Sequence, residues 1–268
     1  MTLRFWIPAS ILIMWGALTL LSPLLPLHPH AIDLTNILTP PGATEWLGYD
    51  DLGRPILDRL LSGAQTSFVV SMSVVFLGVI LGSLLGTASG YCSGWVDQIF
   101  VRVVDILLAF PGLLLAIALA GALGPGIENV IIALAITGWV GYARLARAQV
   151  LSLKQADHVI AATAIGASSW RIITRHLLPL LLAPLIIEAS FGIASAIIAE
   201  AGLSFLGLGV QPPEASWGSM IRDGTRYMLV APHLVIIPGC TLMVVVLAAN
   251  LLGDWLRDWL DVKDQISK

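Results

Sequence analysis

Two glutamates inside an apolar run are the residues of this sequence that most suggest chemistry. Glu188 and Glu200 lie in the interval that follows His176. An ionisable side chain within a membrane-spanning helix is costly and by default marks a functional path or an internal partner. Twelve residues separate the two glutamates, so on a helix of about 3.6 residues per turn they need not share a face. Both are candidates for a translocation path. The alternatives are a structural hydrogen bond for Glu188 and pairing with a basic residue near the outer interface for Glu200.

Motifs for catalysis are missing from the sequence. It holds no G-x-x-x-x-G-K-[ST], so it cannot cradle nucleotide phosphates in a P-loop, and it holds no HExxH or GxSxG. His28 and His30 are the one close histidine pair and fit a solvated interfacial pair better than a metal site. Cys92 and Cys240 lack CxxC spacing and fit small core residues. We therefore predict no catalytic residue, no metal site and no bound cofactor.

The composition is that of a membrane protein. Hydrophobic residues make up 57% of the chain, charged residues only 12%, and the mean hydropathy is +0.89. A soluble domain carries about 25% charged residues. The net charge of −3 argues against a nucleic-acid-binding protein, which would present a basic face.

A spanning helix needs about 20 mainly apolar residues, and the spacing of charged residues predicts an all-α integral membrane protein with six transmembrane helices, of which the fourth has a short apolar interval. The first apolar run, Phe5 to Leu27, is too long for a signal peptide's h-region of about 7–15 residues, so it is expected to remain as a helix. The intervals that hold the six helices are Arg4 to Asp33, Arg59 to Asp97, Asp105 to Glu128, Glu128 to Arg144, His176 to Glu200, and Arg226 to Asp254.

The distribution of basic residues predicts the orientation of these helices. With the N-terminus inside, ten of the fourteen Lys and Arg residues fall in inside segments. The other four fall outside: Arg54, Arg59, Arg222 and Arg226. Since cytoplasmic loops carry the excess of Lys and Arg, both termini are predicted to be cytoplasmic, as is the segment between helices four and five.

Small residues and long loops mark two further features. Gly78, Gly82, Gly86 and Gly90 recur every four residues on the second helix, a stripe that lets another helix approach closely.

The two outside segments are His28 to Ser62 and the one around Pro212, Pro213 and Trp217. Both exceed the length of about 12–15 residues beyond which loops are usually functional or disordered. Asp50, Asp51, Gly53 and Arg54 cluster in a predicted turn of the first of these segments.

The predicted cytoplasmic segment 156–179 reads ADHVIAATAIGASSWRIITRHLLP. Seven of the nine residues from Ala161 to Ser169 are Ala, Gly or Ser, which would let a helix lie close to a partner surface. Gly166 permits a bend, and Trp170, Ile172 and Ile173 offer apolar anchors. An amphipathic helix on the lipid headgroups is the alternative, because Arg171 and Arg175 follow. The segment by itself does not separate docking from membrane binding.

This segment resembles the cytoplasmic EAA loop of bacterial ABC-importer permeases, which reads E-A-A, three residues, G, nine residues, I-x-L-P. The matching positions are Ile160-Ala161-Ala162, Gly166 and His176 to Pro179, with Ile160 in place of the glutamate and His176 in place of the isoleucine. In that family the loop is a coupling helix that docks on the ATPase subunit. The resemblance implies coupling contacts from Ala161, Ala162, Gly166, Ala167, Ser168, Trp170 and Arg171.

Other segments resemble the peptide/nickel branch of the same family, from about Trp46 to Asp261. They are WLGYDDLGRPILDRLLSGAQTS, RVVDILLAFPGLLLAI, AEAGLSFLGLGVQPPEASWGSMI and NLLGDWLRDWLD. The resemblance implies the second, C-type permease of a dipeptide, oligopeptide or nickel importer in the bacterial inner membrane. Its partners would be a homologous permease, two ABC ATPases that carry ATP and Mg²⁺, and a periplasmic or lipid-anchored substrate-binding protein.

This assignment implies alternating access driven by ATP, with Asp50, Asp51, Arg54 and Trp217 as candidate contacts for the binding protein. The chain is expected to divide into residues 1–62 with the first helix and outer segment, a permease core at 63–261 and a cytoplasmic tail at 262–268. A nickel or metal-chelate importer of the same family is the main alternative. A stand-alone secondary transporter is less favoured because no internal repeat is visible.

Overall fold

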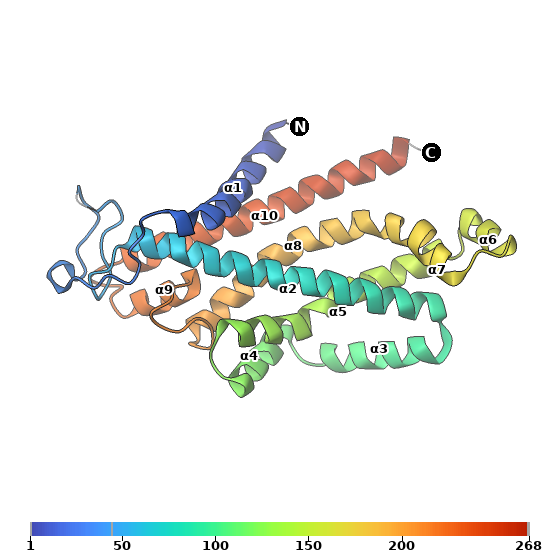
Figure 1. Ribbon diagram of the computed structural model, residues 1–268, viewed down its shortest axis with the longest axis horizontal. Coiled ribbons are helices and arrows are strands. Elements are labelled where there is room, and N and C mark those ends of the chain that lie inside the picture. Colours follow the sequence, from blue (N-terminus) through green and yellow to red (C-terminus); the bar gives the residue numbers. More distant parts are fainter. Residues whose placement is uncertain (1, 44, 267–268) are drawn as a thin grey trace.

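The computed structural model describes residues 2–43 and 45–266, without the side chains of residues 2, 3 and 261–266. Within these residues the chain is helical, and its only β-type pairing is an isolated bridge between Tyr49 and Pro55. Figure 1 shows the helices, which are α1 (Thr2–Leu21), α2 (Ile56–Cys92), α3 (Gly94–Leu108), α4 (Gly112–Leu123), α5 (Ile127–Leu153), α6 (Asp157–Ala164), α7 (Ser169–Ile172), α8 (Leu178–Phe205), α9 (Trp217–Thr225) and α10 (His233–Ile266). Short 3-10 turns, η1 (Ser22–Leu24) and η2 (Leu34–Asn36), and a π-helix, η3 (Ile173–Leu177), complete the set.

Five helical runs in the described residues are long and apolar enough to cross a membrane: Arg4–Leu24, Ile56–Cys92, Ile127–Leu153, Ser169–Phe205 and His233–Leu260. The predicted third span takes a different form. The interval from Asp105 to Glu128 holds only the end of α3 and all of α4, and these two helices meet at an angle of 84°. Pro111 lies at the break; it has no N–H to donate and disfavours helical geometry at the residue before it. The third predicted span is therefore a bent pair and not one straight helix.

Several predicted boundaries also move. The second helix begins at Ile56, so the division expected between residues 62 and 63 falls inside α2. The last helix continues past Asp254 to Ile266, so residues 262–266 of the predicted tail are helical. Residues 267–268 lie outside the described residues. The segment before α8 is helical from Ser169 onward, which joins part of the predicted cytoplasmic loop to the fifth span.

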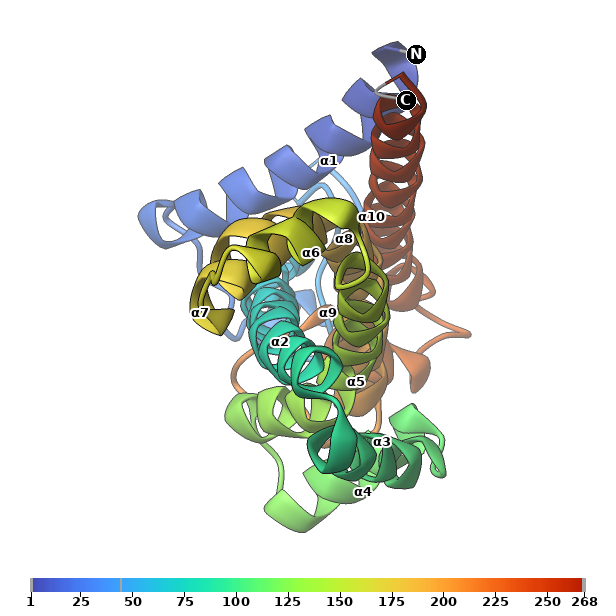
Figure 2. The same ribbon diagram turned by 90° about the vertical axis from the view of Figure 1, so that its right-hand side faces the viewer.

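The two ends of the bundle carry different segments (Figure 1). α6, α7 and the turn between α2 and α3 lie at one end, towards which the first turn of α1 and the last turns of α10 also point. α9 and the chain between α1 and α2 lie at the other end. We call these the inner and outer ends, following the charge-based prediction of orientation. Seen from the inner end, α2, α5 and α8 lie between α1 and α10 on one side and α3 and α4 on the other (Figure 2).

The glycine stripe of α2 packs directly against α5, as predicted. A Cβ on Gly82 would lie 2.6 Å from the Cβ of Tyr142 and 2.7 Å from the carbonyl oxygen of Trp139. A Cβ on Gly86 would overlap the carbonyl group of Ala143. The two backbones are thus closer than any side chain would allow, and the stripe fixes the spacing of the α2–α5 pair.

Replacing Gly86 by alanine should therefore lower the free energy of unfolding by about 1–3 kcal/mol, the usual cost of forcing an extra methyl group into a packed site. Gly121→Ala is the matched control, because nothing lies within 4 Å of a Cβ at that position of α4. There alanine should be neutral or stabilise the helix by up to about 1 kcal/mol. Thermal unfolding of the two variants in detergent checks this difference; equal midpoints would contradict the close approach of α2 and α5.

Arg147 of α5 and Lys154, the residue that follows α5, hold the turn between α2 and α3 at the inner end. Arg147 donates two hydrogen bonds to Asp97, from Nε to Oδ1 at 2.6 Å and from Nη2 to Oδ2 at 2.7 Å. Lys154 donates from Nζ to the carbonyl oxygen of Tyr91 at 2.7 Å and to Oγ of Ser93 at 3.1 Å. The bidentate pair orients both partners. As a result α5, which leads directly into α6, is tied to the inner ends of α2 and α3.

Candidate functional site

The segment after α5 folds into two short helices joined by a tight turn. α6 ends in a Schellman motif, in which the Gly166 N–H bonds to Thr163 O at 3.0 Å and the Ala167 N–H bonds to Ala162 O at 3.0 Å. Gly166 has a φ of +80°, a left-handed conformation that glycine adopts without strain. Ser168 then caps α7 by accepting a hydrogen bond from the Arg171 N–H. The predicted bend at Gly166 is confirmed.

One face of this segment is covered by the bundle and the other is open. Val159, Ala162 and Ile172 are buried, and Val159 and Ile172 share a core cluster with Leu177 and Val150. On the open side, Ile160 is 54%, Ile165 86% and Trp170 75% exposed. We call these three residues the α6–α7 apolar surface.

This arrangement revises the predicted coupling contacts. The predicted coupling residue Ala162 and the predicted apolar anchor Ile172 are buried in the protein's own core, so neither can contact a partner. The other predicted coupling residues are exposed or half-buried: Ala161, Gly166, Ala167, Ser168, Trp170 and Arg171. Ile165 was missed in the sequence, although an isoleucine directly before a turn glycine, where a polar residue is common, is a usable signal.

The two intramembrane glutamates have different surroundings. Glu200 is 1% exposed, and its carboxylate accepts hydrogen bonds from Ser67 Oγ of α2 at 3.0 Å and Ser204 Oγ at 2.7 Å. Pairing of Glu200 with a basic residue, one of the predicted alternatives, is thus replaced by two serines. Glu188 is half-buried and lines a cavity of about 280 Å³ with residues of α2, α5 and α8. Glu188 therefore stays a candidate residue of the translocation path. Glu200 instead links α8 to α2 through its hydrogen bond with Ser67.

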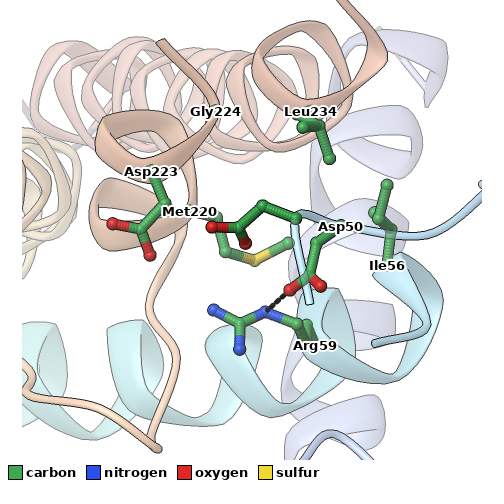
Figure 3. A pocket seen from close by; sticks show the side chains of 8 residues that line it. Asp50, Ile56, Arg59, Met220, Asp223, Gly224 and Leu234 are labelled. Carbon is green, nitrogen blue, oxygen red and sulfur yellow. Dashed lines mark ion pairs between the residues drawn. The ribbon is translucent and has the colours of Figure 1, made fainter. Parts of the chain in front are cut away.

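At the outer end, Asp50 organises a buried ionic cluster (Figure 3). Its Oδ1 accepts the backbone N–H groups of Leu52 and Arg54, both at 2.9 Å. Its Oδ2 accepts from Nε of Arg54 at 2.7 Å and lies 3.3 Å from Nε of Arg59. The Arg59 guanidinium points towards the side of the cavity where Asp223 of α9 lies, and its buried Nη1 has no hydrogen-bond partner among the described residues. The cluster joins the outer segment to α2, and Asp223 of α9 lines the same cavity.

The outer cluster changes the reading of the predicted binding-protein contacts. Asp50, Arg54 and Trp217 are buried, and Nε1 of Trp217 donates to Leu60 O at 3.1 Å. These three side chains therefore stabilise the outer end and are not accessible to a partner protein in this structure. Asp51 is half-buried, and burial, followed by the neighbouring Asp50 charge, raises the pKa of its carboxyl. Of the four predicted contacts, Asp51 alone stays a candidate.

Comparison with known proteins identifies relatives of this chain. The family model described as the inner membrane component of binding-protein-dependent transport systems matches residues 75–263. The glutathione transport system permease protein GsiD of Shigella flexneri serotype 5b (strain 8401) is 48% identical over 231 residues, which cover 86% of this chain and 76% of that protein. GsiD of Escherichia coli O157:H7 is 46% identical with the same coverage.

Solved structures share the fold at low sequence identity. A chain of the MetNI methionine ABC transporter in an inward-facing conformation matches with a TM-score of 0.64 and 17% identity, covering 76% of this chain and 97% of that one. A chain of an amino acid ABC transporter with histidines matches with a TM-score of 0.59 and 16% identity, covering 76% and 95%. At such identities the likeness concerns the arrangement of helices.

Proposed function

This chain belongs to the dipeptide/oligopeptide family of ABC-importer permeases and is a multi-pass component of the inner membrane, and on that premise we propose that it moves small peptides from periplasm to cytoplasm by alternating access. Members of the family are membrane components, with ATP hydrolysis on another subunit. We propose a complete transporter of this chain, a homologous second permease, two ABC ATPases with their ATP and Mg²⁺, and a periplasmic or lipid-anchored substrate-binding protein.

The exposed α6–α7 apolar surface is the observation that carries this proposal. Isolated large apolar side chains on a surface need no explanation, but three that are exposed on one short segment favour a protein partner. Ile160 stands where the related loop has a glutamate, so docking here rests on shape and apolar contact. The ATPase subunits are the partners proposed for this surface.

The connections of this surface to the bundle suggest how a push on it would spread. α6 follows α5 directly, and α5 is fixed to α2 by the glycine stripe and to the α2–α3 turn by Arg147 and Lys154. When the ATPases close on ATP, they would displace α6 and α7 and tilt these helices together, which opens the path outward. Hydrolysis would then return the helices to the inward-facing arrangement.

The nature of the substrate is proposed from the named relatives. The two relatives named above are glutathione transport permeases, and glutathione is a small peptide. The structural neighbours come from methionine and amino acid transporters. Peptides or closely related solutes are therefore favoured over a nickel chelate.

The test is uptake by liposomes that contain the complete transporter, with the partner binding protein added outside and its bound ligand identified by mass spectrometry. We expect a peptide on the binding protein and accumulation that requires both ATP and that protein. A bound nickel chelate would replace the substrate assignment. Uptake driven by an ion gradient without the ATPases would overturn the proposal in favour of a secondary transporter.

A further inference from the structure

Glu188 faces an open cavity between helices of the bundle, and the exposed Ser195 is part of its lining. Glu188 is in the first half of α8, and the cavity of about 280 Å³ is lined by α2, α5 and α8 with Gly112 at the start of α4. Its polar lining consists of Glu188, Thr137, Tyr142 and Ser195. Ser195 follows Glu188 by seven residues, about two helical turns, so both project from the same face of α8.

Glycines leave the room into which the carboxylate projects. A Cβ on Gly141 of α5 would lie 3.4 Å from Oε1 of Glu188. A Cβ on Gly192 of α8 would overlap the hydroxyl of Tyr142, so the tyrosine ring packs over that glycine. The Glu188 carboxylate therefore lies next to the backbone of Gly141 in α5, where no side chain intervenes. The ring of Tyr142, packed over Gly192, lines the same cavity.

The carboxylate of Glu188 has no protein partner among the described residues. Among the described residues, no ion pair and no side-chain hydrogen bond includes Glu188. Glu200, on the same helix, has both oxygens occupied by serine hydroxyls. Because a carboxylate in a spanning helix must pair or face a water-filled cavity, the two glutamates represent the two solutions.

The other polar groups of the cavity offer acceptors more than donors. The hydroxyl of Thr137 donates to Leu134 O at 3.2 Å, and the hydroxyl of Ser195 donates to Phe191 O at 3.0 Å, each within its own helix. Their hydrogens are thereby used, and their oxygen lone pairs remain for a ligand. With Glu188 the cavity presents one negative charge, the acceptor oxygens of Thr137 and Ser195, the hydroxyl of Tyr142 as both donor and acceptor, and no cationic lining residue.

We propose that Glu188 is the counter-charge for the ammonium group of the transported peptide, and that Thr137 and Ser195 accept hydrogen bonds from the same group. An ammonium has three N–H donors and no acceptor, which matches this lining. The inference rests on the proposed function, because it assigns a substrate group to the path. It assigns to this chain a preference for solutes with a free amine.

A cysteine in the cavity can report the preference without knowledge of the natural substrate. The reporter is Ser195→Cys in the complete reconstituted transporter, with Cys92 and Cys240 replaced by alanine. The rates of modification by the cationic trimethylammonioethyl and the anionic sulfonatoethyl methanethiosulfonates are compared. We expect the cation-to-anion ratio of rates to fall about tenfold when Glu188→Gln is added, as a unit charge a few ångströms away in a partly aqueous site would produce.

Matched variants guard this result. Glu188→Asp should keep most of the ratio. Glu128→Gln removes the same charge from the exposed first turn of α5 and should leave the ratio unchanged. An unchanged ratio in Glu188→Gln, or no reaction of Ser195→Cys with either reagent, would overturn the inference.

Protection of the same cysteine tests the ammonium group itself. When Glu188 is present, dialanine, which has an ammonium group, should slow modification of the thiol in Ser195→Cys. N-acetyl-dialanine, which lacks the ammonium group, should not slow it. Equal protection by the two, or protection by neither, would overturn the assignment, and protection by Ni²⁺ alone would assign the site to a metal cation. ATP-dependent uptake in the same liposomes is a separate measurement that tests the proposed function. If uptake is absent while the cation-to-anion ratio of modification rates is as expected, the proposed function is contradicted and the charge preference of the cavity is not.

Discussion

Replacing Ile165 by aspartate should reduce ATP-driven uptake at least about tenfold while the amount of folded transporter stays the same. Ile165 is 86% exposed, so the fold does not depend on its side chain. If the side chain is buried against the ATPase, its loss removes about 1.5–3 kcal/mol of apolar burial, which corresponds to roughly 10–100-fold in affinity. Uptake and ATP hydrolysis are measured on the same liposomes.

Ile32→Asp is the matched control for this experiment. Ile32 is 61% exposed but belongs to the chain between α1 and α2 at the outer end. The same change there should leave both uptake and hydrolysis near the unmodified values. Normal uptake in Ile165→Asp would show that the α6–α7 apolar surface does not transmit the ATPase movement.

Replacing Asp50 by alanine should destabilise the protein by about 3–5 kcal/mol. Asp50 is the shared partner of Arg54 and Arg59, which are both buried, and Arg59 already has one unpaired donor. Removing one partner of a buried ion pair leaves uncompensated charge in a poorly hydrated site, and this costs several kcal/mol. Thermal unfolding in detergent and the yield of monodisperse protein report the loss.

Asp33→Ala provides the comparison for this loss. Asp33 is exposed, lies in the same outer segment and accepts only local hydrogen bonds, from Thr35 and Asn36. Since Asp33 caps only the short η2 turn and its partners can turn to water, this change should lower stability much less than Asp50→Ala does. Equal stability of the two variants would show that the Asp50 cluster does not hold the outer end together.

The helical architecture could be predicted because charge spacing and composition reflect the lipid environment directly. The bent α3–α4 pair could not, since proline by itself does not decide a break in a membrane helix. Pro8, Pro184 and Pro238 lie inside α1, α8 and α10, whereas Pro111 separates α3 from α4. Neighbouring helices that satisfy the freed backbone groups make this difference, and they are not visible in one sequence.

The candidate sites were predictable where they depend on local sequence. The turn at Gly166 and the cluster of Asp50 with Arg54 are formed by residues close together in the chain. Which side of α6 is open is decided by packing against Val150 and Leu177, and eight residues carry too weak a pattern to indicate it. The position of Asp223 near Arg59 joins elements more than 150 residues apart and likewise required the structure.

The most direct test of the central claim is a photo-crosslink from position 165. Benzoylphenylalanine replaces Ile165 in the complete transporter reconstituted in lipid, and the products of irradiation are identified by mass spectrometry. If the α6–α7 apolar surface receives the ATP-driven movement, the crosslink forms to the ATPase subunit and its yield changes on addition of ATP. Crosslinks to lipid alone would contradict the account and show that this segment lies on the membrane surface.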